Sequence, residues 1–151
     1  MPGRLLEMAV GVVDRIAAVV PVRRHPPKQP EHLITGEAGE DAAYFYLRRL
    51  GYTIVSRGFR SPRRRGDIDL IGWDGDVLCF VEVKTRTTRA VKPAEAAVDR
   101  AKKKHLSRVA QEYLRRLPSR PAFRFDILSV YCENLEATPE FCLYKNAFPL
   151  A

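Results

Sequence analysis

An Asp-Gly pair between two apolar stretches constrains the fold of this chain more than any other feature. The stretches DIDLIG and VLCFVEVKTR flank the four residues WDGD. Asp-Gly between apolar runs is the strongest short-range signal for a two-residue β-turn. With Asp74 and Gly75 as that turn, we expect an antiparallel hairpin in which Asp69 lies opposite Phe80.

The predicted hairpin gathers charged side chains on one face, because opposed residues of paired strands share a face. Asp67, Asp69, Glu82 and Lys84 then project together. Asp69 and Glu82 become diagonal neighbours, with α-carbons roughly 7 to 8 Å apart. Two such carboxylates repel each other unless a cation lies between them, and Mg²⁺ or Mn²⁺ prefers carboxylate oxygens. The pattern predicts a divalent-metal site, with Lys84 in reach of an attacking water or a phosphate oxygen.

A plainer interpretation of this pattern is a solvated hairpin face with cross-strand ion pairs, each worth about 0.2 to 1 kcal/mol. The apolar residues Ile71, Leu78 and Phe80 fall on the same face, however. A carboxylate bordered by large apolar side chains is costly unless it is paired or metal-bound. This neighbourhood favours a sheltered site over a wet face.

Helical periodicity occurs on both sides of the hairpin in the sequence. We expect one helix capped by Thr35 and ended by Gly51, and a longer helix from Pro93 to Leu117. Further strands are expected over residues 52–59, 122–131 and 140–148. The order of helix, three strands, helix and strands predicts a mixed α/β fold, with a central sheet and a helix packed on each side.

The first 32 residues differ in character from the rest, so we expect the compact domain to cover residues 33–151. Residues 4–20 have an amphipathic helical pattern, and PVRRHPPKQPEH is typical of an extended linker. We expect this helix to dock on its own domain or on a second copy, forming a homodimer. No stretch approaches the ~20 apolar residues of a membrane span. The three cysteines lack a C-x-x-C pair, which favours a reducing cytoplasm.

The chain is basic, with 26 Lys+Arg against 18 Asp+Glu and a net charge of +8. Such a balance attracts polyanions, nucleic acid first among them, although charge alone is equally compatible with a basic protein that binds none. For Arg100, Arg115 and Arg116 a solvated helix face is the preferred interpretation. The residues expected to contact a nucleic-acid backbone are Arg63, Arg64, Arg65, Arg86, Lys102, Lys103 and Lys104.

Several separated motifs resemble one known family. GDIDLIGWDGDVLCFVEVKTR is similar to the core motif of the PD-(D/E)xK nuclease superfamily. With GEAGEDAAYFYLRRLGY before it and KNAF near the end, the chain resembles the bacterial YraN-like family of predicted endonucleases, itself similar to archaeal Holliday junction resolvases. The resemblance covers about residues 33–148. It implies a restriction-endonuclease-like fold and cleavage of DNA, with branched or structured DNA among the candidate substrates.

The resemblance also implies roles for particular residues. Asp69 and Glu82 match the metal-binding acids, Lys84 matches the lysine of the motif, and Glu40 matches a helical glutamate that orients metal or water. Glu37 competes for that last role, although a carboxylate near a helix N-terminus is favourable in itself. Lys103 stands where many relatives have glutamine. This departure keeps a second function open, a nuclease-fold module that binds nucleic acid or protein without cutting.

Overall fold

The computed structural model describes residues 31–63, 66–87, 98–133 and 137–151. In chain order, the elements are α1 (Glu31–Arg49), β1 (Thr53–Arg60), β2 (Asp67–Asp74), β3 (Val77–Arg86), α3 (Arg100–Arg115), β4 (Phe123–Tyr131) and β5 (Glu140–Phe148). The predicted order of helices and strands is confirmed, and β3 and β5 have the predicted bounds.

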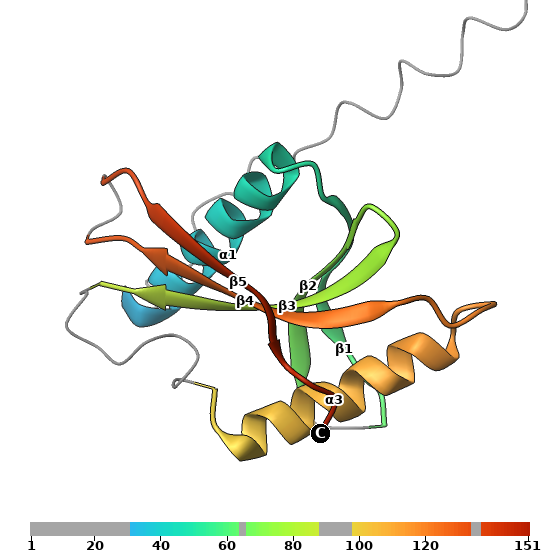
Figure 1. The fold of residues 1–151 in the computed structure, drawn as a ribbon. Coiled ribbons are helices and arrows are strands. Elements are labelled where there is room, and N and C mark those ends of the chain that lie inside the picture. Colours follow the sequence, from blue (N-terminus) through green and yellow to red (C-terminus); the bar gives the residue numbers. More distant parts are fainter. Residues whose placement is uncertain (1–30, 64–65, 88–97, 134–136) are drawn as a thin grey trace, which may run out of the picture.

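A mixed five-stranded sheet separates two helical layers. The strand order is β1-β2-β3-β4-β5, and all neighbours are antiparallel except β3 and β4. Helix α1 covers one face of the sheet and α3 covers the other, as Figure 1 shows. The core on the α3 face includes Phe80, Phe125 and Leu106, and the core on the α1 face includes Leu47 and Val81. The predicted α/β fold class, that of restriction-endonuclease-like proteins, is confirmed.

Strand β3 lies at the centre of this sheet, and its buried run explains its apolar composition. Every residue from Leu78 to Val83 is buried, Glu82 included. A strand covered by a helix on both faces needs apolar side chains on both, so such a strand has no polar alternation. The buried Glu82 is therefore an exception that stability does not explain.

The β2–β3 hairpin forms as predicted, but its register differs by two residues. Asp74 pairs with Val77, so Gly75 and Asp76 make the turn. Gly75 has φ +59° and takes the first central position, where a tight hairpin turn favours glycine. The predicted pairing of Asp69 with Phe80 is wrong. A shift of two leaves each side chain on its predicted face of β3, because the side-chain period of a strand is two.

Helix α1 is longer at its N-terminus than predicted. It begins at Glu31, so Thr35 lies within the helix and does not cap it. Its end follows prediction, since Gly51 has φ +94° and donates its N–H to the Arg48 carbonyl. A β-carbon on Gly39 would overlap the Thr85 side chain of β3. This glycine therefore allows α1 to lie directly against the strand that carries Glu82.

Helix α3 is shorter than predicted, since it begins at Arg100 and ends at Arg115. Residues 93–97, part of the predicted helix, lie outside the described residues. Asp99 is the N-cap, and its side chain accepts a hydrogen bond from the Lys102 N–H at 2.8 Å. A β-carbon on Gly66 would overlap the His105 ring, so α3 packs directly onto the residue before β2.

The predicted amphipathic N-terminal helix and residues 21–30 of the predicted linker lie outside the described residues, whereas the last two residues of that linker, Glu31 and His32, belong to α1. The domain start at residue 33 and the homodimer remain predictions. Among the described residues, no helix is long and apolar enough to cross a membrane. Cys79, Cys132 and Cys142 are all free thiols, in agreement with the absence of a predicted disulfide framework.

Candidate active site

The side chains of β2 change faces at Asp69. Leu70 belongs to the core under α1, whereas Ile68 and Ile71 both belong to the core under α3. A regular strand would place Ile68 and Leu70 on the same face. The prediction that Asp67 lies on the same face as Asp69 and Ile71 is therefore wrong. The regular alternation of side chains between the two faces of the sheet is broken at Asp69.

Strand β1 breaks its side-chain alternation beside the same residues of β2. Arg57 forms an ion pair with Asp41 of α1, whereas Phe59, two residues later, contacts Tyr113 of α3 with ring centroids 5.0 Å apart. Between them lies Gly58, with φ +60°, a conformation that glycine adopts most readily. Arg57 pairs with Leu70 and Phe59 with Ile68, so Gly58 faces Asp69 across the two strands.

Pairing between β2 and β3 ends next to Asp69. The last backbone pair is Leu70 with Val81, and continuing this register by one residue sets Asp69 opposite Glu82. The Val83 N–H donates to Asp69 Oδ2 at 2.7 Å instead of to a strand carbonyl. The Asp69 carboxylate thus occupies the opening between the two strands, directly beside Glu82. The charge of Glu82 acts on Asp69, so the two acids lie close together as predicted, although the predicted strand register is wrong.

The surroundings of Asp69 disfavour its charge. Burial, followed by the negative charge of Glu82, raises the pKa of Asp69 well above that of an ordinary aspartate. Glu40 acts in the same direction, whereas the Val83 N–H and the positive charge of Lys102 oppose the rise. A partly buried carboxylate with a raised pKa beside a second carboxylate is a common feature of functional sites.

Two lysines converge on one oxygen of Glu82. Lys84 Nζ lies 2.7 Å from Glu82 Oε1, and Lys102 Nζ lies 3.2 Å from the same atom. The Glu82 side chain is only 4% exposed. Its other oxygen, Oε2, is buried and has no hydrogen-bond partner among the described residues. Glu82 is therefore sheltered, and the interpretation of this region as a solvated hairpin face does not hold for it.

Two further buried polar atoms have no partner in the part of the chain that the structure describes, and both lie on the neighbouring part of β3 and β4. They are Arg86 Nε on β3 and Ser129 Oγ on β4. Ser129 pairs with Lys84 in the β3–β4 register, and Arg86 follows Lys84 by two residues, which places all three on the face of Glu82. Within the described chain, the buried side-chain atoms that lack a partner are thus confined to this part of β3 and β4. Unsatisfied groups gathered in one place mark a ligand site more strongly than isolated ones.

Glu40 reaches the site from α1, on the other face of the sheet. Burial, and then the charge of Asp67, raises the pKa of Glu40, while Arg57 acts in the opposite direction. Glu40 in turn acts on Asp69. Glu37, the alternative residue for this role, is exposed. Glu40 therefore interacts electrostatically with Asp67 and, more weakly, with Asp69.

The predicted nucleic-acid-binding residues have different surroundings. Lys102 contacts Glu82, and Lys103 Nζ lies 5.7 Å from the centroid of the Phe148 ring. Arg63 and Lys104 are exposed, and Arg86 is partly buried. The remaining two predicted contacts, Arg64 and Arg65, lie outside the described residues.

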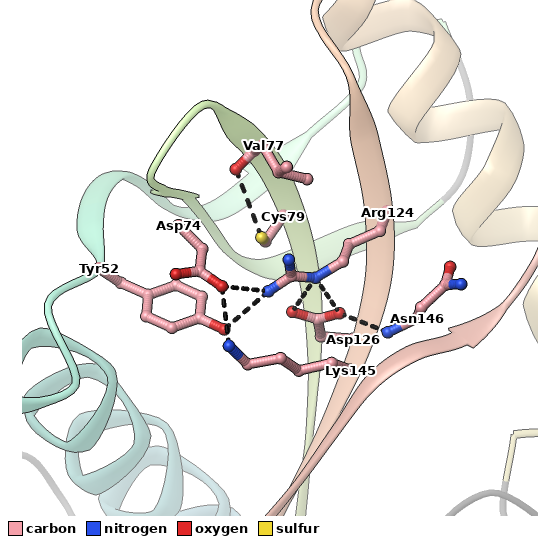
Figure 2. A network of polar contacts seen from close by, with 8 residues as sticks. All are labelled: Tyr52, Asp74, Val77, Cys79, Arg124, Asp126, Lys145 and Asn146. Atoms are coloured by element: carbon pink, nitrogen blue, oxygen red, sulfur yellow. Dashed lines mark hydrogen bonds and ion pairs between the residues drawn. The ribbon is translucent and has the colours of Figure 1, made fainter.

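A second polar cluster lies near the turn of the hairpin and has a different character (Figure 2). Arg124 Nε donates to both oxygens of Asp126 at 2.9 and 3.1 Å, and Arg124 Nη2 donates to Asp74 and to the Tyr52 hydroxyl at 2.6 and 2.9 Å. Lys145 Nζ lies 2.8 Å from Asp74. Every charge in this cluster has an internal partner, so the cluster ties strands together and leaves no group for a ligand.

The donor set at Asp69 and Glu82 suits a hard divalent cation. The two carboxylates supply oxygen atoms, and Glu82 Oε2 lacks the partner that a buried charged oxygen requires. The described residues contain no group of three or more His, Cys, Asp or Glu side chains arranged to hold a metal ion. Mg²⁺ typically needs only one or two protein carboxylates, with waters and substrate phosphates completing its shell.

Two features of the structure were missed by sequence reasoning. Lys102 was assigned to the nucleic-acid backbone, not to Glu82. The sequence does contain a hint of this contact. With Asp99 as the N-cap, Lys102 lies in a first helical turn that has no acidic residue to pair with it. The Arg124 cluster was also missed, although Arg124 and Asp126, two residues apart in an otherwise apolar strand, form a recognisable pattern.

The fold and the acid–lysine arrangement are those of a PD-(D/E)xK nuclease-like protein. Asp69 on β2 and the sequence Glu82-Val83-Lys84 on β3 supply the motif, with Glu40 on the preceding helix. The profile of the uncharacterised protein family UPF0102 matches residues 39–130. The chain belongs to this family, the YraN-like family that its motifs resemble.

Individual relatives extend the match over nearly the whole chain. A UPF0102 protein of Koribacter versatilis is 48% identical over 145 residues, which cover 96% of this chain and 95% of the relative. One from Solibacter usitatus is 41% identical over 140 residues, with 92% and 99% covered. A third, from Symbiobacterium thermophilum, is 50% identical over 96 residues, with 63% and 80% covered. The Koribacter match extends into the first 30 residues, beyond the family profile.

Proposed function

We propose that this protein is a divalent-metal-dependent endonuclease that hydrolyses phosphodiester bonds in DNA. The observation that carries the proposal is the buried Glu82, one of whose oxygens has no hydrogen-bond partner among the described residues, beside the partly buried carboxylate of Asp69. Such a pair is unfavourable to stability. Its cost is offset if the site binds Mg²⁺ or Mn²⁺ during function.

Each residue of the site has a role in this proposal. Asp69 and Glu82 hold the ion, which when bound supplies Lewis-acid stabilisation and a lowered pKa for water. Lys84 Nζ, 2.7 Å from Glu82 and 30% exposed, can donate a hydrogen bond to a phosphate oxygen that enters beside this carboxylate. Glu40, with its raised pKa, orients a water molecule from the α1 side.

The charge of the chain supports nucleic acid as the substrate. Lys102 and Lys103 lie in the first turn of α3, Arg86 ends β3, and the net charge is +8. Such cations neutralise phosphates without reading sequence. Branched DNA is the preferred substrate within this proposal, because a homodimer would match the symmetry of a four-way junction. A protein that acts on bacterial DNA would work in the cytoplasm, and we propose this location.

The test is cleavage of linear, single-stranded and four-way DNA in the presence of Mg²⁺ or Mn²⁺. We expect Asp69→Ala and Glu82→Ala each to abolish cleavage. Asp76→Ala, which removes an exposed carboxylate at the hairpin turn, serves as the matched control and should cleave at the parental rate. Glu40→Ala compared with Glu37→Ala decides which helical glutamate contributes. If the parent binds DNA but never cuts it, and both site variants keep that affinity, the protein is instead a non-catalytic binding module.

A further inference from the structure

Lys102 stands at a position that disfavours a cation. It lies in the first turn of α3, which contains no acidic residue. The N-terminus of a helix carries a partial positive charge, so a lysine there is destabilising unless a carboxylate compensates for it. The Asp99 carboxylate caps the helix through the Lys102 N–H, and the Lys102 ammonium group pairs with Glu82 of β3, whose Oε1 lies 3.2 Å from Lys102 Nζ.

The packing of α3 fixes this approach. His105 lies one turn after Lys102 and therefore on the same side of the helix. Its ring contacts Gly66 so closely that a β-carbon at residue 66 would overlap it. This contact holds the helix against the start of β2, the strand that carries Asp69. The position of Lys102 beside the acids thus follows from the way in which the helix packs.

The two lysines on Glu82 are not equivalent. Lys84 extends from β3, the strand of Glu82 itself, and its Nζ is the closer, at 2.7 Å. Lys102 is on a separate element, is farther from the carboxylate and has a side chain that is 33% exposed. The two side chains are similarly exposed, 30% for Lys84 and 33% for Lys102, so the difference lies in the contact itself. Lys102 has the longer contact and extends from a separate helix, so it is the more weakly held of the two lysines.

We propose that Lys102 is a positioning residue: the counter-ion of Glu82, released when a divalent cation binds and then available to a phosphate of the nucleic-acid backbone. The inference rests on the proposed function, because it assumes that Asp69 and Glu82 form the metal site. Two ammonium groups beside one carboxylate reduce its attraction for a divalent ion. Once released, Lys102 adds a cation for a phosphate, so metal and nucleic acid strengthen each other's binding.

The inference predicts effects of opposite sign for one substitution. We expect Lys102→Met to bind Mn²⁺ about fivefold more tightly than the parent, because one screened positive charge is removed from beside the ligands. In the presence of Mn²⁺, the same variant should bind four-way DNA at least about fivefold more weakly. A lysine that only supported the fold would not tighten metal binding when removed.

Isothermal titration with Mn²⁺ and fluorescence anisotropy with labelled four-way DNA measure the two effects on the full chain. Arg100→Met is the matched control, because it removes an exposed cation from the same helical turn. It should leave the Mn²⁺ affinity unchanged. Lys102→Gln repeats the test with a polar side chain, and Lys102→Arg, which keeps the charge, should return the Mn²⁺ affinity towards the parental value.

The outcomes separate this inference from the proposed nuclease function. Unchanged or weaker Mn²⁺ binding by both Lys102→Met and Lys102→Gln would overturn it, as would the absence of Mn²⁺ binding from parent and variants alike. If the parent binds Mn²⁺ and the Lys102 variants shift both affinities as expected, but no DNA is ever cut, the counter-ion role stands and the nuclease function fails.

Discussion

Replacement of Arg124 by methionine is the most informative test of how the sheet is held together. Arg124 connects β4 to the hairpin turn through Asp74, to the start of β1 through Tyr52, and to the neighbouring Asp126 (Figure 2). Methionine keeps much of the apolar stem and removes the guanidinium. The change therefore isolates the loss of the charged hydrogen bonds.

The expected magnitude follows from what each partner retains. Asp74 keeps Lys145, at 2.8 Å, and is partly exposed, so its loss is small. The Asp126 side chain has no exposure and loses both hydrogen bonds from Arg124, while it keeps the Asn146 N–H at 2.8 Å. Removing one partner of a buried ion pair costs about 3 to 5 kcal/mol. Because Asp126 keeps one donor, we expect the free energy of unfolding to fall by about 3 kcal/mol.

Urea unfolding followed by circular dichroism measures this loss. Arg120→Met is the control, since Arg120 is exposed and only stacks over Phe123, and it should cost less than about 1 kcal/mol. Adding Asp126→Asn to Arg124→Met removes the stranded charge and should recover part of the stability. A loss below about 1 kcal/mol for Arg124→Met, or no recovery in the double variant, would refute the argument that a buried unpaired carboxylate dominates.

Three further predictions concern Asp69 of the candidate site, Gly66 beside α3 and Asp74 of the hairpin. Asp69→Asn should raise the midpoint of thermal unfolding of the metal-free protein at pH 8, because it removes a carboxylate whose charge is disfavoured by its surroundings and by Glu82; a lower midpoint in calorimetry would contradict this. Gly66→Ala should destabilise by roughly 1 to 3 kcal/mol in urea, because residue 66 has φ +119° and the new methyl group meets His105; an unchanged midpoint would contradict the packing. Hydrogen bonds from Lys145 and then Arg124 lower the pKa of Asp74 to about 2, so its stabilising contribution is complete above about pH 4 and disappears as the pH falls through 2. The stability difference between the parent and Asp74→Asn should therefore be constant from pH 5 to 8 and shrink below pH 4.

The arrangement of the hairpin shows what local sequence could and could not predict. The Asp-Gly pair predicted the turn, but the two residues of the loop are Gly75 and Asp76. Asp74 instead closes the hairpin and binds Arg124 and Lys145, which lie 50 and 71 residues away in the chain. No local pattern contains those contacts. The faces of β3 were nevertheless predicted correctly, because a register error of two residues preserves them.

The site was predictable to the extent that it lies on the hairpin. Glu82 and Lys84 share a face as strand alternation predicts, and Asp69 reaches them from the neighbouring strand although its predicted partner was wrong. The break in side-chain alternation at Asp69 of β2 was not predicted. It lies opposite Gly58 of β1, and the sequence of β2 alone does not contain this neighbour. The contact of Lys102 with Glu82 was not predicted either, because it depends on how α3 packs across the sheet, and periodicity does not specify the packing partner of a helix.

A crystal of the protein soaked in Mn²⁺ would test the central claim most directly. The anomalous signal of manganese locates the ion independently of any assay of cleavage. We predict one Mn²⁺ ion bound by both Asp69 and Glu82, with Glu82 Oε2 among its ligands. A crystal in which manganese binds elsewhere, or does not bind, while Glu82 remains paired with Lys84 and Lys102, would contradict the account.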